Sequence, residues 1–227
     1  MFKLLFTKLA ILSLLLVSVS SYLYGGGLLG EKHDVLLTAG GSVPVGGFGD
    51  TGGDFGDNDS GLATFGFNLG ANYLYTFDRL FSVGGAIGFI WNGTATEIEE
   101  LAGEVDNASS YLNIPITVTI GKFFNVAENV DIFGLLHGGV SIVSLTGEQS
   151  ISGVSETANL TYSGIAPVIK VDVGVSFHNI LIGIGYFTSL GEAVLTGEST
   201  SEDNNTIGDT DSSQSISTFN FYIGYRI

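Results

Sequence analysis

Five polar side chains lie in segments that are otherwise apolar, and they are the residues of this chain best suited to chemistry. They are Asp131, His137, Lys170, Asp172 and Arg226. Carboxylates, an imidazole and two cations could carry acid–base catalysis, or they could form a buried network of ion pairs and hydrogen bonds. The chain has three histidines, and none lies in a long polar segment. A Ser–His–acid site needs a histidine beside a serine, so we favour the network and expect no catalytic residue.

Acidic residues gather in four long polar segments, which contain no lysine or arginine and 17 of the 23 acidic residues. These segments are 46–61, 94–109, 146–164 and 191–214. Carboxylate oxygens suit Ca²⁺ and Mg²⁺, and the candidate ligands are Asp57, Asp59, Asp209 and Asp211. The glutamate that should close a calcium loop after Asp57 is missing. We therefore favour solvated, mutually repelling loops over a metal site, and we expect no cofactor.

Composition excludes several classes of protein. The net charge of −16 argues against a nucleic-acid partner, whose phosphates require clustered lysine and arginine. The absence of cysteine excludes disulfides and thiolate metal sites. Only 13% of the residues are charged, about half the share of an ordinary soluble domain, while glycine is abundant at 34 residues. Such a chain exposes much of its surface to something other than water.

The first 25 residues have the pattern of a cleaved signal peptide. Lys3 and Lys8 precede an apolar stretch, 9–19, and small serines follow it. The apolar stretch is shorter than the ~20 residues that a membrane-spanning helix needs. We expect residues 1–25 to be removed after export, and residues 26–227 to form one domain.

The mature chain contains eight segments in which apolar and polar residues alternate, the period of a β-strand with two different faces. They are 34–45, 62–77, 80–93, 110–124, 130–145, 165–177, 180–190 and 217–227. In the last one, Phe219, Phe221, Ile223 and Tyr225 share one face with the terminal Ile227. The fifth is ambiguous because both of its faces carry apolar residues. In the sixth, a lysine facing lipid would cost roughly 2–4 kcal/mol, so Lys170 and Asp172 should face a lumen.

The connections alternate strictly between short and long. Short turns are expected at 78–79, 125–129 and 178–179, and the four acidic segments provide the long connections. Aromatic residues gather near both ends of the strands, where rings favour membrane interfaces. The pattern predicts an all-β fold, an eight-stranded antiparallel up-and-down transmembrane β-barrel. We expect it in a bacterial outer membrane, with the long loops extracellular and both mature termini periplasmic.

The signal peptide, eight alternating strands, short–long connections and aromatic last strand together resemble small outer-membrane barrels of the OmpA/OmpX type. The resemblance implies outer-membrane lipid around the barrel and assembly by the outer-membrane machinery. In that family the last strand is also the assembly signal and normally ends on an aromatic residue. This chain departs from that pattern at Ile227, from which we expect an unusual Gram-negative or spirochaete-like bacterium.

We interpret the chain as a monomeric, non-enzymatic surface protein whose acidic loops contact an extracellular ligand or a host surface. Three alternatives remain at this point. They are a narrow, porin-like, cation-preferring pore, a lipid-modifying enzyme, and a secreted soluble barrel of the lipocalin kind. The last would turn its apolar faces inward.

Overall fold

The computed structural model describes residues 33–50, 63–77, 81–94, 107–150, 157–191, 193–200 and 206–227. It contains ten strands and a short 3₁₀ helix, η1 (Gly46–Gly49), within these ranges. The strands are β1 (His33–Pro44), β2 (Ala63–Phe77), β3 (Phe81–Thr94), β4 (Asn107–Ala127), β5 (Val130–Ser150), β6 (Thr157–Phe177), β7 (Ile180–Ser189), β8 (Ala193–Thr200), β9 (Thr206–Gln214) and β10 (Ser217–Arg226). Among the described residues, no helix is long and apolar enough to cross a membrane.

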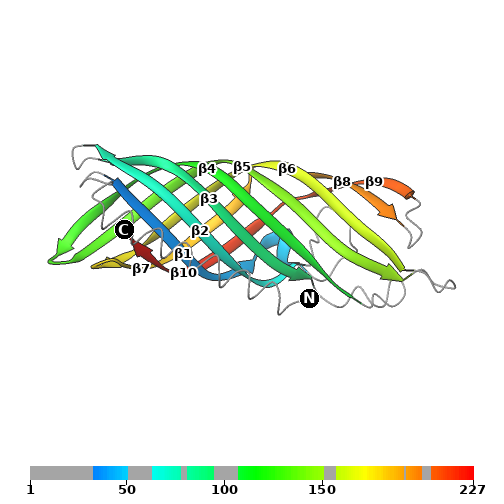
Figure 1. Cartoon of the computed structure of the whole chain (residues 1–227), viewed down its shortest axis with the longest axis horizontal. Coiled ribbons are helices and arrows are strands. Elements are labelled where there is room, and N and C mark those ends of the chain that lie inside the picture. Colours follow the sequence, from blue (N-terminus) through cyan, green and yellow to red (C-terminus); the bar gives the residue numbers. More distant parts are fainter. Residues whose placement is uncertain are drawn as a thin grey trace.

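Eight of these strands close into an antiparallel barrel, as the alternation predicted (Figure 1). Each pairs with its neighbour in the order β1 to β7, and β10 closes the barrel by pairing with both β7 and β1. The last described residues complete this seam, because the backbones of Val35 and Ile227 exchange two hydrogen bonds of 2.9 and 3.1 Å. The predicted signal peptide, 1–25, and the predicted turn at 78–79 lie outside the described residues.

The register fixes how steeply the strands tilt. A row of paired residues that starts at Gly174 on β6 passes through Gly183, Tyr222 and Gly40 on β7, β10 and β1. It continues through β2, β3, β4 and β5 and returns to β6 at Gly164, ten residues from its start. With a strand rise of ~3.3 Å and a spacing of ~4.8 Å, this offset requires a tilt of about 41°. An eight-stranded barrel of this tilt is only wide enough inside for side chains.

Large apolar side chains point outward on these strands. Val118, Ile182 and Ile223 are 66, 65 and 60% exposed, whereas their neighbours along the strand face the lumen and are mostly buried. The fifth strand follows the same rule. Its even positions, such as Leu136, face outward, and Phe133 fills the lumen, which explains why both faces are apolar in the sequence. This arrangement is the reverse of a soluble barrel and contradicts the lipocalin alternative.

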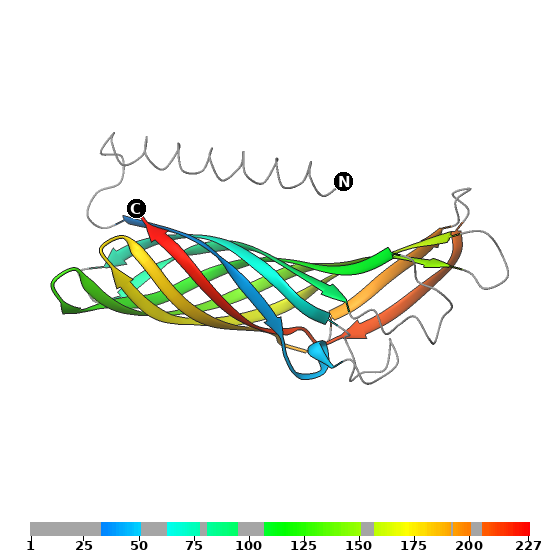
Figure 2. The same cartoon turned by 90° about the horizontal axis from the view of Figure 1, so that it is seen from below.

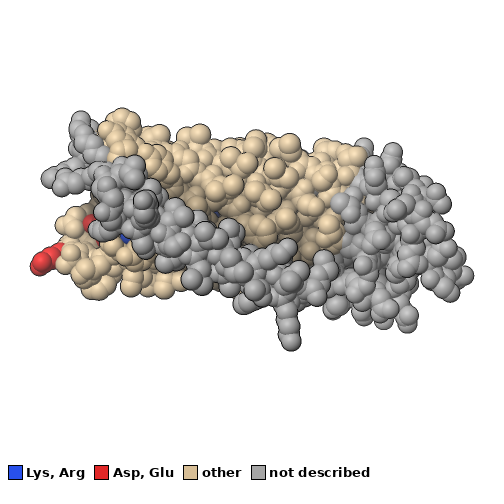
Figure 3. All heavy atoms as spheres, in the orientation of Figure 1, with Lys and Arg blue, Asp and Glu red and all other residues tan. Residues whose placement is uncertain are grey.

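Of the charged side chains that the structure describes, all but Lys122 lie in the lumen or at an end of the barrel. In the view of Figure 3, the described acidic and basic groups that can be seen lie toward one end of the barrel. Figure 2 places the C-terminus at the end with the tight turns and β8 and β9 at the opposite end. The turns are formed by Glu128-Asn129 and His178-Asn179, where Asn129 and His178 have positive φ angles of 61° and 52°.

Two of the predicted long connections are wrong in part, because regular strands extend into them. The β5–β6 ladder continues without a register shift from Val130 and Phe177 to Ser150 and Thr157. Residues 193–200 and 206–214 form the β8–β9 hairpin, whose β8 pairs with β6 beyond the end of β7. Polar residues occur on both faces of these extensions, so the sequence gives no two-residue alternation that would reveal them.

Candidate functional site in the barrel lumen

Three neighbouring strands bring the central polar side chains together. Thr119 on β4 pairs in register with His137 on β5, which pairs with Lys170 on β6. Asp172 follows two residues after Lys170, so strand alternation directs all four side chains to the same face. Thr119, His137 and Asp172 are at most 2% exposed. The cluster is therefore formed by inward-facing strand residues and not by a loop.

Asp172 is the centre of this cluster. Its Oδ2 atom lies 2.9 Å from Lys170 Nζ and 2.9 Å from His137 Nε2. The histidine ring is not aligned for a hydrogen bond at Nε2, so we treat that contact as electrostatic. The other ring nitrogen, Nδ1, lies 2.8 Å from the hydroxyl of Thr119. The ammonium of Lys170 also lies over the ring of Tyr222, 5.6 Å from its centroid.

Two glycines on β7 make room for these side chains. A Cβ on Gly185 would overlap Asp172 Oδ1, and a Cβ on Gly183 would lie 2.6 Å from the ring of Tyr222. Real Cβ atoms do not approach other atoms so closely. Asp172 and Tyr222 can therefore lie flat against the wall of the barrel only because β7 has no side chain at these positions.

A second cluster lies near the tight turns and is centred on Arg226 of β10. Its Nε donates to Asp34 on β1 at 2.7 Å, and its Nη1 donates to Asp131 on β5 at 3.0 Å. Asn125 also donates to Asp131, at 3.1 Å. The guanidinium stacks over Phe123 at 4.2 Å from the ring centroid. Because β5 and β10 are not neighbours in the barrel, Arg226 ties one wall of the lumen to another.

The five residues proposed from the sequence thus face inward, but they form two clusters rather than one. Asp34 and Thr119 are additional members that we did not propose. Both could have been found from strand parity, because Asp34 alternates with the outward Val35 and Thr119 with the outward Val118. The pairing of Arg226 with Asp131 could not have been found in this way, because alternation shows which face a residue is on but not which residue lies opposite it on a strand that is not adjacent.

Apolar layers separate and cover these clusters. Along the inward face of β5, the charged Asp131 is followed by Phe133 and Leu135, then by His137, and then by Val143 and Leu145. The layer near the tight turns consists of Leu36, Leu74, Phe133, Leu135, Leu181 and Tyr222, with Phe123 against it. The layer near the long connections consists of Phe48, Ala63, Ile90, Tyr111, Val143, Leu145, Ala166, Val168, Phe187 and Ile216, with Tyr162 against it.

Phe48 shows how this second layer is closed. It belongs to η1, which follows β1 directly, and it is 1% exposed. Its ring meets that of Tyr111 edge to face at 5.0 Å between centroids. The described start of the connection after β1, η1, therefore folds over the lumen, and the His137 cluster lies between two layers of packed apolar side chains.

The candidate metal ligands are not brought to a described site. Asp57 and Asp59 lie outside the described residues, and Asp209 and Asp211 lie on β9, where the structure describes only the backbone. Within the described part of the chain, no three histidine, aspartate or glutamate side chains come together in a way that could hold a metal ion. The loop-metal hypothesis stays a prediction.

Solved structures share this fold at low sequence identity. A major outer membrane protein from Thermus thermophilus has a TM-score of 0.52 at 10% identity, over 86% of this chain and 99% of that one. The outer membrane protein OprG from Pseudomonas aeruginosa has a TM-score of 0.51 at 11% identity, over 86% and 96%. No family model and no curated sequence matches the chain. The fold is that of small outer-membrane β-barrels, as the sequence resemblance implied.

Proposed function

We propose that this protein is an integral outer-membrane β-barrel that neither conducts nor catalyses and acts through its surface-exposed end. The outward apolar wall supports the membrane location, because a wall of half-exposed valine, isoleucine and phenylalanine would be unfavourable in water and is favourable in lipid. The tight turns and the C-terminus would then face the periplasm, and the long acidic connections would face outside.

One observation supports a lumen that does not conduct ions: packed apolar layers lie on either side of the His137 cluster. A water-filled pore needs a continuous polar path, and these layers interrupt it. The cation-preferring pore is therefore the weaker proposal, although the acidic end of the barrel would attract cations.

Single-channel recording in planar bilayers tests this proposal. We expect no conductance steps from the wild-type protein. A variant that removes one large ring from each layer, Phe133→Ala with Phe187→Ala, should leak if it remains folded. Stepwise conductance from the wild-type protein would refute the closed lumen.

The buried position of His137 supports a non-enzymatic role. Its nearest acid, Asp172, already neutralises Lys170, and neither His137 nor Thr119 is reachable from lipid or solvent in the described structure. Mass spectra of envelope lipids should not change when the protein is expressed. A modified lipid that disappears with His137→Gln would contradict this role.

The end of the barrel that carries the four long acidic segments supports a surface-interaction role. The four long segments contain 17 acidic residues and no basic residue, and the extended strands of β5, β6, β8 and β9 carry part of them beyond the barrel. A partner with basic groups would be attracted to it. Proteoliposomes should bind a polylysine surface and not an uncharged one, and replacing 193–214 with a tight turn should weaken binding while the barrel stays folded.

A further inference from the structure

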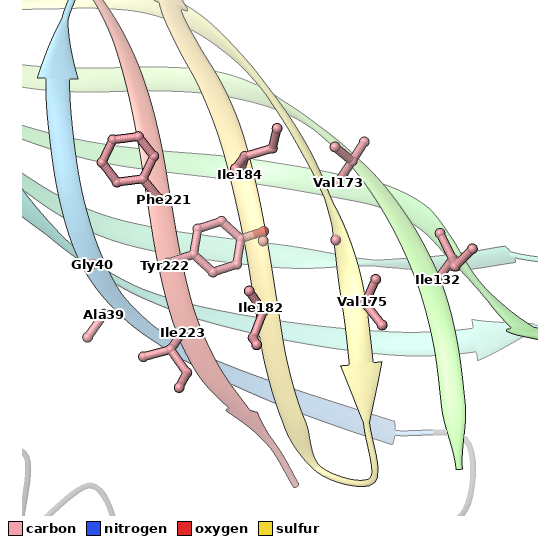
Figure 4. A pocket seen from close by; sticks show the side chains of 12 residues that line it. Ala39, Gly40, Ile132, Val173, Val175, Ile182, Ile184, Phe221, Tyr222 and Ile223 are labelled. Atoms are coloured by element: carbon pink, nitrogen blue, oxygen red, sulfur yellow. The ribbon is translucent and has the colours of Figure 1, made fainter. Parts of the chain in front are cut away.

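A shallow groove lies on the outer wall of the barrel. It has a volume of about 910 Å³ and extends over β5, β6, β7, β10 and β1 (Figure 4). Its sides are outward apolar side chains, among them Ile132, Val173, Ile184 and Phe221, and its floor includes the backbone of Gly174 and Gly183. Because glycine backbone forms part of its floor, this groove is a place where a long apolar chain could lie against backbone.

A lysine lies on β4, the strand next to the one that carries the groove residue Ile132. Lys122 has the same parity on β4 as the outward Ile120, and its ammonium is 5.0 Å from the ring centroid of Phe124. It pairs in register with Gly134, which pairs with the groove residue Val173. Nothing lies within 4 Å of a Cβ built on Gly134, so open space separates the lysine from the groove.

Lys122 also differs from the other described lysine and arginine residues in having no carboxylate partner among the described residues. Lys170 and Arg226 each contact carboxylates inside the lumen. Within the described ranges, Lys122 has no carboxylate at ion-pair distance. Its contact with Phe124 occupies the face of the ring and leaves ammonium hydrogens available for an anion.

We propose that Lys122 and the groove together bind one phospholipid of the surrounding bilayer. The phosphate would accept hydrogen bonds from Lys122 Nζ, and an acyl chain would pass over Gly134 into the groove. The inference rests on the proposed membrane location, which places Lys122 near the periplasmic interface. Charge complementarity selects a phosphate-bearing lipid, since the groove alone would accept any acyl chain.

Native mass spectrometry of the full chain, released from detergent after exposure to defined lipids, tests the site. The probes are phosphatidylglycerol and diacylglycerol with identical acyl chains. Wild-type protein should retain phosphatidylglycerol and lose diacylglycerol. Lys122→Gln should lower the retained fraction about fivefold, the effect of one basic residue near an anionic lipid surface.

Two glycines on β5 provide a matched pair of variants. Gly134→Leu should also lower retention, because it fills the space between Lys122 and the groove. Gly138→Leu should not, although nothing lies within 4 Å of its Cβ either and it lies on the same strand. Equal retention by wild type and Lys122→Gln would overturn the site, and so would equal retention of the two lipids by the wild-type protein.

Heat-modifiable gel migration and insertion into vesicles are measured first for every variant. A wild-type protein that does not insert would refute the membrane location itself. A wild-type protein that inserts but does not discriminate between the two lipids would refute only the lipid site. The comparison of lipids needs no substitution, so it decides the question even if a variant fails to fold.

Discussion

Replacing Asp172 with asparagine should destabilise the barrel by about 3 kcal/mol. The 2.9 Å contact between Lys170 Nζ and Asp172 Oδ2 corresponds to about 6 kcal/mol of attraction at an effective dielectric constant of 20. Desolvation of both ions offsets most of it, yet removing one partner of a buried pair typically costs 3–5 kcal/mol. The side chain of Lys170 is 22% exposed, so the pair is not fully buried and the cost should fall at the low end.

Urea unfolding in lipid vesicles, followed by tryptophan fluorescence, measures this free energy. The chain has a single tryptophan, Trp91, which lies on β3 and reports on the barrel wall. The expected result is a lower urea midpoint for Asp172→Asn with an unchanged slope, because the surface exposed on unfolding is the same.

A double-mutant cycle with Lys170→Met separates the ion pair from general damage to the lumen. Removing both charges should cost less than removing Asp172 alone, because no uncompensated ammonium is left inside. Strictly additive losses, or a loss below about 0.5 kcal/mol for Asp172→Asn, would show that the pair is not a buried ion pair and would refute the reasoning.

Three further predictions use the same unfolding assay. Val118→Arg should cost about 2–4 kcal/mol if the outer wall lies in the bilayer, whereas Glu128→Arg in the β4–β5 turn should change little; equal effects would argue against the membrane placement. Gly185→Ala should cost about 1–3 kcal/mol because its Cβ overlaps Asp172, while Gly138→Ala, which points into open space, should be nearly neutral; a neutral Gly185→Ala would mean that Asp172 can move aside. Arg226→Met should cost about 1–3 kcal/mol by leaving Asp34 and Asp131 without a cation, and adding Asp34→Asn should recover part of the loss; no recovery would place the damage elsewhere.

Strand parity made most of the barrel predictable. Where one face is apolar and the other polar, as on β2 with Phe65 outward and Asn68 inward, the sequence determines both the strand and its facing. The free-energy cost of a lysine that faces lipid also places Lys170 in the lumen. The facing of β5, which is ambiguous in the sequence, is explained by its neighbour β6. Its inward Phe133 fills the space opposite Gly174.

Other features depend on contacts that alternation does not encode. The β8–β9 hairpin is mostly polar, and its few apolar residues do not alternate with polar ones, so its strands carry no period-2 signal. The apolar layers also remained hidden, because lumen-facing Leu74 and Leu181 interrupt an otherwise polar face by single residues. Phe48 lies in a connection, and only the folded position of η1 brings it into the lumen.

The ten-residue offset of the hydrogen-bonded row has a consequence for how the chain closes. Because the eight registers add up around the barrel, a slip of two residues in any hairpin would reappear at the last seam, where β1 meets β10. There, Leu36 would no longer lie opposite Arg226, and the guanidinium would miss Asp34 on one side and Asp131 on the other. The register of the β1–β10 seam therefore depends on the other seven pairings, and a slip in any of them would separate Arg226 from its carboxylates.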